Sequence, residues 1–517
     1  MDRMEPVDLN AAADAYASTP LLNCLLRETA DATGEEGVHR LRGSGRLLRV
    51  RGGRRPVRPE LGTRQGWRPL SHAELVKLSS DELRLYTGVP NDELPAEIND
   101  SRDAIAALLG ARAAAEAPAD PYVLSEQALV MGHPHHPAPK ARGGAPAASW
   151  LPYAPEAHAR FPLLFLGVRE DQAMEEGGPA AADAIEALAG TLDGPRAPAG
   201  YRLLPAHPWQ LALVAGRPAV REAFADGRLV RLGPGRRPVW PTASVRTLYV
   251  PDPARDLFLK FSLDVRITND VRRLWRHDLL RVRRTDAAVL AGFADLRRAG
   301  SNALWLSDRG YRTAGFAFEE LAVLVRDGLH GRLAPGAGPL LAAALAEGFE
   351  GSPLASAPDP AAWWRAYLRQ VVPPVLGLFA RRGIVLEAHL QNCLVAVDGR
   401  GMPVQALFRD AEGVKLPADL SREAAWQRLV YCLVVNHLTE IAGALAERHP
   451  DVAGQLWPAV REELLRFDAA HDLPEIAGLL AAPTLPAKTN LLLRWTGADG
   501  ADARYLPLPN PLRIHGG

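Results

Sequence analysis

Apolar and polar positions divide the chain into three stretches, and the first of them predicts helices. Residues 9–29 are expected to form a helix that is interrupted near Pro20, and residues 100–117 a second helix capped by Asp100 or Ser101. The segment RVRGGRRPVRPELG lies between them, and its glycines and prolines predict a loop or hairpin with basic side chains on the solvated surface. The N-terminal part is therefore predicted to be mainly helical.

The middle of the chain, from about residue 121 to 300, predicts strands because short apolar segments alternate there with proline and glycine. Four segments have this character: FPLLFLGV at 161–168, RLLP at 202–205, RTLYV at 246–250 and DLFLKFSL at 256–263. The segment GPGRRPVWP at 233–241 is expected to be a turn between two of these strands. Helical patterns return at 284–299 and 318–328.

A hairpin is expected inside the last part of the chain. Residues 361–383 predict a helix that is broken at its double proline, after a loop at 351–360. IVLE at 384–387 predicts a short strand. CLVAV at 393–397 and PVQALF at 403–408 predict a hairpin because the Asp-Gly of a DGRG turn joins them.

The C-terminal end of the chain returns to helix. Residues 422–481 predict mostly helix, and KTNLLLRW at 488–495 predicts a last strand before a proline-rich tail. These expectations describe a mixed α/β (α+β) protein with a helical N-terminal part, a strand-rich middle and a mostly helical C-terminal part that contains one hairpin. We place the three parts at 1–120, 121–300 and 301–517.

Composition indicates a soluble globular protein with a large core. Apolar residues make up 47% of the 517 residues and charged residues 23%. A chain of this length is expected to contain about two to four domains. Sixty basic residues balance sixty acidic ones, so no strong basic field favours a nucleic acid as a partner.

Cysteine usage and the N-terminal sequence favour the cytoplasm. The three cysteines are too few and too scattered for a disulfide framework or a four-thiolate metal site. The first ten residues, MDRMEPVDLN, lack the apolar core of a signal peptide. The longest apolar stretches, such as LVYCLVV at 429–435, fall short of the ~18 residues needed to span a bilayer, so no membrane partner is expected.

Several familiar catalytic motifs are missing. A Walker A loop needs Gly-Lys, and no lysine here follows a glycine, so a P-loop nucleotide site is excluded. The GSG at 43–45 lacks the third glycine of a dinucleotide-binding fingerprint, and neither a G-x-S-x-G elbow nor an H-E-x-x-H zinc helix occurs. The chemistry must therefore depend on other groups of residues.

The segment GHPHHPAPKARGG at 132–144, here called the cationic loop, carries a high density of cations. His133, His136, Lys140 and Arg142 lie within ten residues of one another, and the prolines hold the segment extended. Such a loop can direct several cations at one anion that bears carboxylates or phosphates. A zinc site is a weaker interpretation, because no cysteine is near. The alternative is a proline-rich surface loop.

Hydroxyl and cationic side chains recur in the strand-rich middle. Ser244 and Arg246 are two apart and are expected on the same face of a strand, with Lys260 on the next strand. Thr268 and Arg272 are four apart, one turn of a helix. These five side chains can hold a triphosphate without a glycine-rich loop. The alternative is a basic surface, but Lys260 lies among apolar residues and is expected to be partly buried next to an anion.

Polar residues also flank the predicted hairpin. His389, Gln391 and Asn392 leave the short strand before the hairpin together, and Asp410 ends it. Protein kinases have a similar order, with an Asn in the catalytic loop, a hairpin and then a metal-binding Asp. Glu387, Asn392 and Asp410 offer hard oxygen ligands that suit Mg²⁺. The alternative is an ordinary hairpin whose polar residues satisfy each other.

Together these motifs resemble the IucA/IucC family, the synthetases that build siderophores independently of nonribosomal peptide synthetases. The matching patterns are GHPxHPxxKxRxG at 132–144, HPWQ at 207–210, PTxSxRT at 241–247, the Lys, Thr and Arg spaced over 260–272, and ExHxQN at 387–392 followed by a distal Asp. HPWQ is weak alone, because a lone histidine is more often a core residue than a ligand. PLLNCLLRE at 20–28 and KTNLL at 488–492 are similar to the family's opening helix and closing segment.

The resemblance implies a hand-like fold of thumb, fingers and palm, with ATP between fingers and palm. The three predicted parts would then be thumb-like, fingers-like and palm-like domains. The implied activity is that of an ATP-dependent ligase. A carboxylate, often citrate, is adenylated with release of pyrophosphate, and an amine or hydroxyl group then attacks the acyl adenylate to give an amide or ester and AMP. ATP and Mg²⁺ are the implied cofactors.

The resemblance also implies a role for each matching residue. The ATP-binding set is Ser244, Arg246, Lys260, Thr268, Arg272, His389, Gln391 and Asn392, and within it Arg246, Lys260, Arg272 and His389 are the candidate catalytic residues. The carboxylate substrate is expected at His133, His136, Lys140 and Arg142, and Mg²⁺ at Glu387 and Asp410. His135, at a variable position of the family, is given no role. Ala243 fills a position that is often serine, so one minor hydroxyl contact is in doubt.

Two other functions fit parts of the pattern. A kinase-like phosphotransferase would also explain Lys260 and Asp410, but it would release ADP. A non-catalytic carboxylate or siderophore-binding protein would explain the cationic loop but not the predicted Mg²⁺ ligands. The expected partners are small-molecule carboxylates and amine or hydroxyl substrates, and dimers are common in the family. The sequence leaves open which carboxylate and which nucleophile are used.

Overall fold

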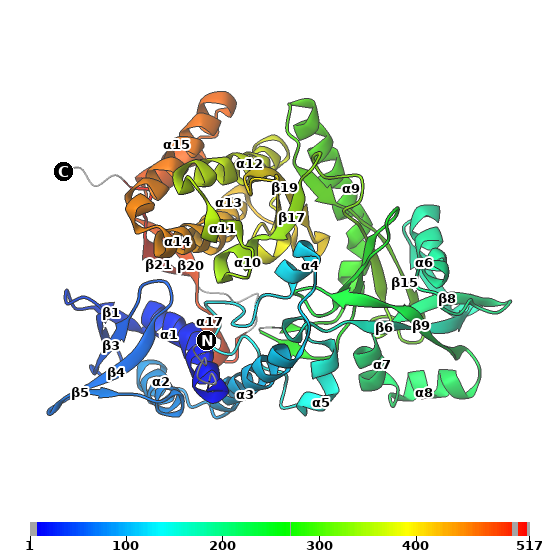
Figure 1. The fold of residues 1–517 in the computed structure, drawn as a ribbon, viewed down its shortest axis with the longest axis horizontal. Helices are drawn as coiled ribbons and strands as arrows, with labels where there is room; N and C mark the ends of the chain where they lie inside the picture. Colours follow the sequence, from blue (N-terminus) through cyan, green and yellow to red (C-terminus); the bar gives the residue numbers. More distant parts are fainter. Residues whose placement is uncertain (1–7, 269, 499–504, 514–517) are drawn as a thin grey trace, which may run out of the picture.

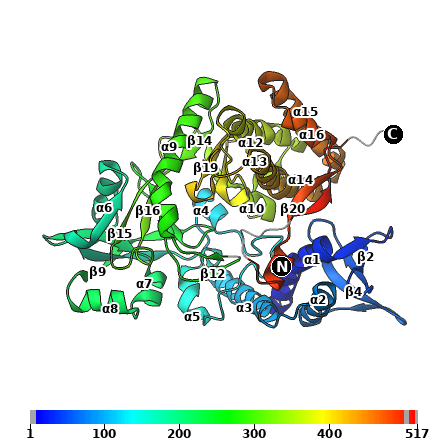
Figure 2. The same cartoon turned by 180° about the vertical axis from the view of Figure 1, so that it is seen from behind.

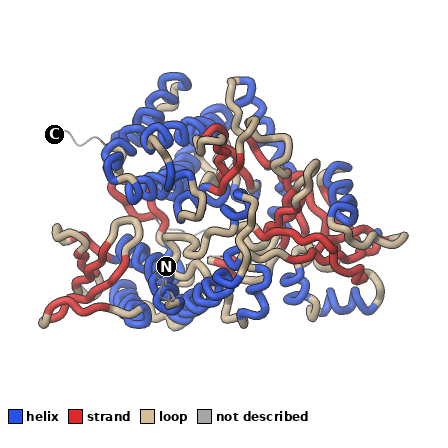
Figure 3. Tube along the Cα trace, in the orientation of Figure 1, coloured by secondary structure: helices blue, strands red, loops and turns tan. Residues whose placement is uncertain are grey.

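Three groups of elements surround a centre made of loops (Figure 1). The computed structural model describes residues 8–268, 270–498 and 505–513. The N-terminal group is blue, the strand-rich group cyan to green, and the mostly helical group yellow to orange (Figure 1). Figure 2 shows the arrangement from behind, and Figure 3 shows helix and strand in all three groups. The predicted mixed α/β fold class is confirmed.

The N-terminal group packs helices against an antiparallel sheet. Its elements are α1 (Leu9–Thr29), the strands β1 (Ala30–Ala32), β2 (Val38–Leu41), β3 (Leu47–Arg51), β4 (Val57–Thr63) and β5 (Gly66–Pro69), then α2 (His72–Thr87) and α3 (Glu93–Ala114). Contrary to the prediction, α1 runs through Pro20 without a break, because buried residues on both sides of the proline outweigh one lost hydrogen bond. Asn91 accepts the first N–H groups of α3, so Asp100 and Ser101 lie inside this helix and do not cap it.

The predicted basic hairpin is formed by β3 and β4, and its Arg51 and Arg58 are exposed as expected, but Arg54 and Arg55 are not on a solvated surface. Arg54 donates to Glu440 at 3.0 Å and to the carbonyl oxygen of Ala346 at 3.1 Å. Arg55 donates to the carbonyl oxygens of Ala346 and Glu347 at 2.9 and 2.6 Å. The prediction of a solvated surface was wrong for Arg54 and Arg55, because partners far away in the sequence cover these two guanidinium groups.

An eight-stranded antiparallel sheet dominates the second group. Its order is β7 (Ala173–Glu176), β15 (Asp308–Ala314), β16 (Val323–Asp327), β11 (Leu257–Phe261), β10 (Thr247–Val250), β9 (Leu229–Pro241), β6 (Phe161–Arg169) and β8 (Tyr201–Ala206). Its helices are α4 (Pro121–Glu126), α5 (Ala147–Trp150), α6 (Pro179–Thr191), α7 (Pro208–Val214) and α8 (Pro218–Ala225), and a small hairpin joins β12 (Arg266–Ile267) to β13 (Asp270–Val271). All four predicted strands belong to this sheet.

Two segments of this region differ from the prediction. Residues 233–241 belong to strand β9 and are not a turn, because their prolines are accommodated where the register between β6 and β9 shifts. Within 318–328 the structure forms β16 and no helix. Every residue of β16 is buried in the sheet, including Arg326 and Asp327, so the strand does not show the apolar–polar alternation of a half-exposed strand. The helix predicted at 284–299 lies within α9 (Arg276–Arg298).

The third group packs helices around a small sheet. Its helices are α10 (Ala342–Glu347), α11 (Pro353–Ser356), α12 (Pro360–Arg382), α13 (Arg422–Val430), α14 (Thr439–Arg448), α15 (Ala453–His471) and α16 (Glu475–Ala481), and the sheet has the order β14 (Leu304–Leu306), β19 (Pro403–Arg409), β18 (Cys393–Val397) and β17 (Gly338–Leu341). The hairpin β18–β19 confirms the prediction. The double proline does not break α12, since most of the helix around it is buried, and the loop expected at 351–360 contains α11.

The last part of the chain differs from the prediction in where it forms strand and where it forms helix. β20 (Thr484–Lys488) pairs with β21 (Tyr505–Pro509) in the proline-rich tail, whereas most of the predicted last strand forms α17 (Asn490–Trp495). Leu491 and Trp495 of α17 join the hydrophobic core of the N-terminal group, so both ends of the chain stabilise the same unit.

One stretch of the described chain is long and apolar enough to cross a membrane, by length and composition. It runs over Arg422–Arg448 and includes a π-helical segment, Tyr431–Leu438. Most of its apolar window, 72%, is buried inside the protein, as expected of a core helix.

The three largest hydrophobic cores broadly follow the three groups, and a smaller core joins α4 and β11 of the second group to β17, β18 and β19 of the third. The eight-stranded sheet recruits β15 and β16 from beyond residue 300, and the N-terminal core recruits α17. The boundaries at 120 and 300 remain predictions.

Candidate active site

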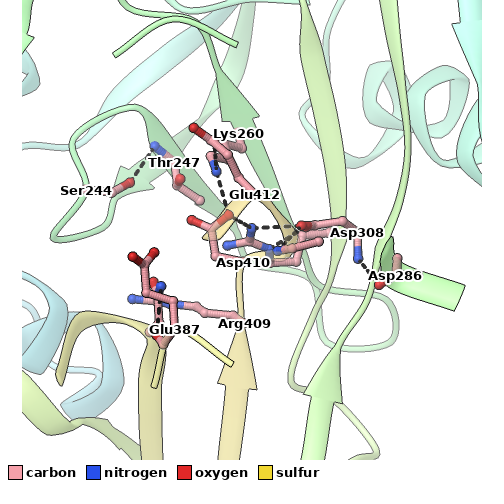
Figure 4. Close-up of polar contacts among 12 residues, drawn as sticks. Ser244, Thr247, Lys260, Asp286, Asp308, Glu387, Arg409, Asp410 and Glu412 are labelled. Carbon is pink, nitrogen blue, oxygen red and sulfur yellow. Dashed lines mark hydrogen bonds and ion pairs between the residues drawn. The ribbon is translucent and has the colours of Figure 1, made fainter. Parts of the chain in front are cut away.

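Lys260 lies at the centre of the candidate site. It is on β11, opposite Thr247 of β10 in the antiparallel register, and only 2% of the residue is exposed. Its Nζ lies 2.6 Å from Oδ1 of Asp410 and 2.7 Å from Oε2 of Glu412 (Figure 4). A buried ammonium group needs an anion, so the prediction that Lys260 is buried next to an anion is confirmed.

Ser244 and Arg246 lie in the loop that enters β10, not on the strand as predicted. Val245 between them has a φ of 66°, which no residue adopts inside a strand. The Ser244 hydroxyl accepts the N–H of Thr247 at 3.1 Å and so shapes the loop (Figure 4). Arg246 is buried and donates to Oε2 of Glu412 at 3.1 Å, which brings the loop to the same acids as Lys260.

Thr268 and Arg272 belong to the small hairpin β12–β13 and not to a helix. The turn places Nη2 of Arg272 2.5 Å from Oγ1 of Thr268, so the two side chains meet as predicted although the local structure differs. The carbonyl oxygen of Arg272 accepts a hydrogen bond from Arg246 at 3.1 Å. Burial and the neighbouring Arg246 lower the pKa of Arg272, and two adjacent guanidinium groups favour binding of an anion.

Asp410 and Glu412 follow directly after β19. Asp410 has a φ of 83° and also lies 3.2 Å from Nη2 of Arg326 on β16. Burial raises the pKa of Asp410, but Lys260 and Arg326 outweigh it and hold the pKa well below the usual range. Burial likewise raises the pKa of Glu412, and Lys260 and Arg246 lower it further than burial raises it. Both carboxyl groups are therefore ionised at neutral pH.

The ExHxQN motif forms a turn beside these acids. His389 precedes a short 3₁₀ turn, Leu390–Asn392, that leads into β18, and Nδ2 of Asn392 donates to the carbonyl oxygen of Glu387 at 3.3 Å. The Glu387 carboxylate accepts from Arg428 at 2.7 Å and lies 3.8 Å from His389. Burial lowers the pKa of His389, which Glu387 only partly offsets. Gln391 contributes its carbonyl oxygen to Arg409 of β19 at 2.9 Å.

Two cations of the cationic loop are buried beside one acid. Lys140 donates to Oε1 of Glu156, and Nη2 of Arg142 lies 3.4 Å from the same oxygen. Ser101 and Asp100 of α3 accept the backbone N–H groups of Lys140 and Arg142 at 3.0 and 2.6 Å. The role that sequence analysis gave these cations, binding of a carboxylate substrate, stays a prediction because both pair with Glu156 here.

His133 is the exposed histidine of the four residues predicted to bind the carboxylate, whereas His136 is buried. Surrounding protein nevertheless lowers the pKa of His133 well below its usual value, and the neighbouring His136 and His389 lower it further. The cationic loop therefore reaches the ExHxQN turn.

The remaining motifs, HPWQ and the KTNLL segment, contribute buried polar residues around the site. His207 is buried, accepts the N–H of Trp209 at 3.2 Å and has a pKa lowered to about 3 by burial, as in a neutral core histidine. The side-chain oxygen of Gln210 accepts the backbone N–H of Asp264 at 2.8 Å. Lys488 ends β20, and its pKa is lowered by burial and by the nearby Arg428, the partner of Glu387.

Several charged residues of the site were not predicted from the sequence. Glu412 binds both Lys260 and Arg246, and its place two residues after Asp410 was an available signal. Arg326 pairs with Asp308 at 2.6 Å, and nothing in the sequence singles out either residue. Arg409 and Glu126 form a buried pair at 2.6 Å that links β19 to α4.

Models of known families match two parts of the chain. Residues 121–347 match the model described as IucA / IucC family, and residues 361–503 match one described as ferric iron reductase FhuF-like transporter. Among solved structures, the ATP-bound aerobactin synthetase IucA of Klebsiella pneumoniae has a TM-score of 0.85 at 24% identity, covering 97% of this chain and 100% of the other. The petrobactin biosynthesis protein AsbB of Bacillus anthracis has a TM-score of 0.79 at 18% identity, covering 98% and 96%. These structures share the fold.

Curated relatives are similar over most of the chain. The L-2,3-diaminopropanoate–citrate ligase of Staphylococcus aureus is 31% identical over 76% of this chain and 75% of its own length. The rhizobactin siderophore biosynthesis protein RhbC of Rhizobium meliloti is also 31% identical, with the same coverage. The names of these relatives disfavour the kinase-like and non-catalytic alternatives. The chain therefore belongs to the IucA/IucC family of siderophore synthetases, and the ligase function predicted from its motifs is confirmed.

Proposed function

We propose that this protein uses ATP to adenylate one carboxyl group of citrate and joins that group to an amine, with release of pyrophosphate and AMP. Relatives named as ligases of citrate with L-2,3-diaminopropanoate, spermidine and D-ornithine support citrate and an amine as substrates. The ATP-bound description of the solved IucA relative supports the nucleotide. We also propose that the reaction takes place in the cytoplasm, where these small substrates are available.

The observation that carries the proposal is the meeting of distant cations and acids at one place. Lys260 and Arg246 come from the eight-stranded sheet and its loop, whereas Asp410 and Glu412 come from the hairpin of the third group. A carboxylate that attacks the α-phosphate of ATP is repelled, because both groups are anionic. Fixed cations in a partly buried site lower this repulsion and stabilise the charge that develops.

The phosphates are proposed to lie along the cations, with hydroxyl groups at the edges. Arg246, Lys260 and Arg272 supply the positive charge, and Ser244 and Thr268 lie next to them as hydrogen-bonding groups. Gln391 and Asn392 are proposed to approach the nucleotide from the opposite turn. This assignment follows the family motifs residue by residue and is supported by the pairing of Arg272 with Thr268.

Mg²⁺ is proposed to bind at the acids of the site. Across the described residues, no three His, Cys, Asp or Glu side chains form a complete metal cage. Mg²⁺ usually binds through one or two carboxylates together with substrate phosphates, so Glu387, Asp410 and Glu412 fit an ion that is shared with ATP. Bound there, Mg²⁺ would neutralise phosphate charge in the transition state.

Citrate is proposed to bind between the cationic loop and the ExHxQN turn. His133 and His136 are candidates for direct contact, while Lys140 and Arg142 contribute positive charge from behind. In the second step the amine nitrogen bonds to the acyl carbon, the bond from that carbon to the AMP oxygen breaks, and the nitrogen loses a proton. His389 has a lowered pKa and is neutral at pH 7, so it can accept this proton.

Product analysis tests the proposal. We expect the purified protein, with ATP, Mg²⁺, citrate and a panel of amines that includes L-2,3-diaminopropanoate, to form AMP and pyrophosphate in equal amounts together with an amide. Omission of citrate is the control and should remove pyrophosphate release. ADP as the nucleotide product would overturn the proposal in favour of a phosphotransferase. Citrate binding without ATP turnover under any amine would identify a binding protein instead.

A further inference from the structure

A cleft of about 1030 Å³ lies against the cationic loop. The end of α1, the hairpin β3–β4, the cationic loop and the helices α14 and α15 line it, so it lies between the N-terminal and the third group of elements (Figure 1). Its volume is that of a small-molecule site. Leu26, Leu456 and Trp457 give it an apolar wall.

The charges on the wall of this cleft favour an anionic group. Four arginines line it, together with the acids Glu36 and Glu440. Arg49 is neutralised by Glu60 at 2.7 Å, and Arg54 by Glu440 and Glu447 at 3.0 and 2.8 Å. Neither Arg27 nor Arg51 forms an ion pair with a carboxylate of the described chain. Two guanidinium groups are therefore available for an acid from outside, which they can bind through charge-assisted hydrogen bonds.

A conflict between hydrogen bonds points to the same conclusion. Nε2 of His135 lies 2.8 Å from a guanidinium nitrogen of Arg27 and 3.2 Å from a carboxylate oxygen of Glu440. Arg27 can only donate, so Nε2 must carry no proton toward it, yet a hydrogen bond to Glu440 requires a proton on the same nitrogen. Nδ1 of His135 is buried without a partner among the described groups. A carboxylate bound to Arg27 would accept its N–H groups and leave His135 to donate to Glu440.

The cleft is next to the place where the acyl group is proposed to form. His135 lies on its wall, and its neighbours in the cationic loop are His133 and His136. Thr439 also lines the cleft, and His437, two residues earlier in the same helical stretch, lies 2.9 Å from the carbonyl oxygen of Ala388 in the ExHxQN turn. The cleft is therefore bordered by the cationic loop and by the helical stretch that contacts the ExHxQN turn.

We propose that this cleft binds the amine substrate and selects amines that carry a carboxylate, with the carboxylate held by Arg27 and Arg51. This inference rests on the proposed function. The amino group of the bound molecule points toward the cationic loop and attacks the acyl adenylate. The carbon–nitrogen bond forms as the bond to AMP breaks, and the nitrogen releases its proton to solvent.

Paired amines test this selection. L-2,3-diaminopropanoate and ornithine each have a partner without the carboxylate, 1,2-diaminoethane and 1,4-diaminobutane, and kcat/KM for amide formation is measured for all four. We expect the wild type to prefer the carboxylated member of at least one pair. Arg27→Met and Arg51→Ala should each reduce that preference about tenfold or more, the effect of one lost charge-assisted hydrogen bond. Arg64→Ala, at the exposed β4–β5 turn, is the matched control and should keep the wild-type preference.

Three outcomes separate this inference from the proposed function. If citrate and ATP release pyrophosphate when hydroxylamine replaces the amine, adenylation is intact. If no carboxylated amine is then accepted, or if both arginine variants keep the wild-type preference, the cleft proposal is overturned while the ligase stands. If hydroxylamine gives no pyrophosphate in the wild type, the proposed function fails first. Arg51 is exposed, so its variant remains informative if Arg27→Met folds poorly.

Discussion

At the residue scale, the site is a network of buried ion pairs in which each member depends on the others. Lys260 is held by Asp410 and Glu412, and its removal would leave two acids without this cation. Loss of one partner from a buried pair costs about 3–5 kcal/mol of folding free energy, so a Lys260 variant tests stability as much as catalysis. A variant of Arg246 reports on catalysis with less effect on stability, because Glu412 still pairs with Lys260 when Arg246 is removed.

Arg246→Ala is expected to abolish most pyrophosphate release. The variant loses a guanidinium group that is proposed to bind phosphate, and loss of one such charge-stabilising group typically costs about 100- to 1000-fold in rate. The measurements are pyrophosphate release with citrate and ATP, and ATP affinity by calorimetry. Arg255→Ala, at the exposed far end of the same β10–β11 hairpin, is the control. Equal ATP affinity in Arg246→Ala and wild type would count against the phosphate assignment.

The local sequence was sufficient to identify charged residues in unusual surroundings. Lys260 stands out because an ammonium group within an apolar strand must be paired, and the cationic loop stands out by its density of charge. Arg326 and Asp308 did not stand out, because a charged residue in a strand is ordinary until the fold places it beside Asp410. Their role depends on contacts between strands that are distant in sequence.

At the element scale, strands and the hairpin were predictable where apolar runs end at turn residues, as at Asp398 and Gly399 between β18 and β19. The failures have a common physical cause. Prolines in β9 are tolerated because register shifts in its pairing with β6 free them from donating hydrogen bonds. Burial of all of β16 removes the periodic pattern that distinguishes a strand from a helix. In both cases neighbouring elements decide the structure.

The π-helical segment Tyr431–Leu438 holds the ExHxQN turn in place. Nδ1 of its His437 lies 2.9 Å from the carbonyl oxygen of Ala388, next to His389, and Nε2 lies 2.5 Å from the hydroxyl group of Tyr367. The carbonyl can only accept, so Nδ1 carries the proton and Nε2 accepts from the tyrosine. His437 thereby fixes the backbone of the turn from behind, and π-helical segments are often found at functional sites.

His437→Gln is expected to lower both kcat and stability, and the stability difference should depend on pH. Burial lowers the pKa of His437 to about 4, against about 6.5 in the unfolded chain. The unfolded chain therefore takes up a proton below pH 6.5 while the folded protein does not, so the stabilisation is complete above pH 6.5 and is lost as the pH falls. Denaturant unfolding of both proteins should show that the difference in free energy of unfolding between wild type and variant shrinks by about 1.4 kcal/mol from pH 7.5 to 5.5.

Tyr367→Phe is the control, because it keeps the titrating group, His437. A difference that stays constant with pH would contradict the assignment.

At the scale of the whole molecule, the two ends of the chain are tied together next to the site. Glu28, at the end of α1, accepts the backbone N–H groups of the first three residues of α17 at 2.8–2.9 Å. The first of them, Asn490, donates its side-chain amide to the carbonyl oxygen of His135 at 2.7 Å. The end of the chain thus supports the cationic loop, although about 350 residues separate the two in sequence.

Glu28→Ala should therefore act on substrate binding from a distance. It leaves three backbone N–H groups without their acceptor, at about 1–3 kcal/mol for each that water does not reach, so α17 should undock before the rest of the protein unfolds. We expect faster amide hydrogen exchange across Asn490–Trp495 and a KM for citrate raised about tenfold, with a smaller change in the KM for ATP, because the cationic loop loses its support while Lys260 and Arg246 keep theirs. Glu93→Ala, at the exposed start of α3, is the matched control and should change neither quantity. An unchanged KM for citrate in a variant whose α17 exchanges rapidly would show that the loop holds its position without the chain end, and that the site depends only on the two larger groups of elements.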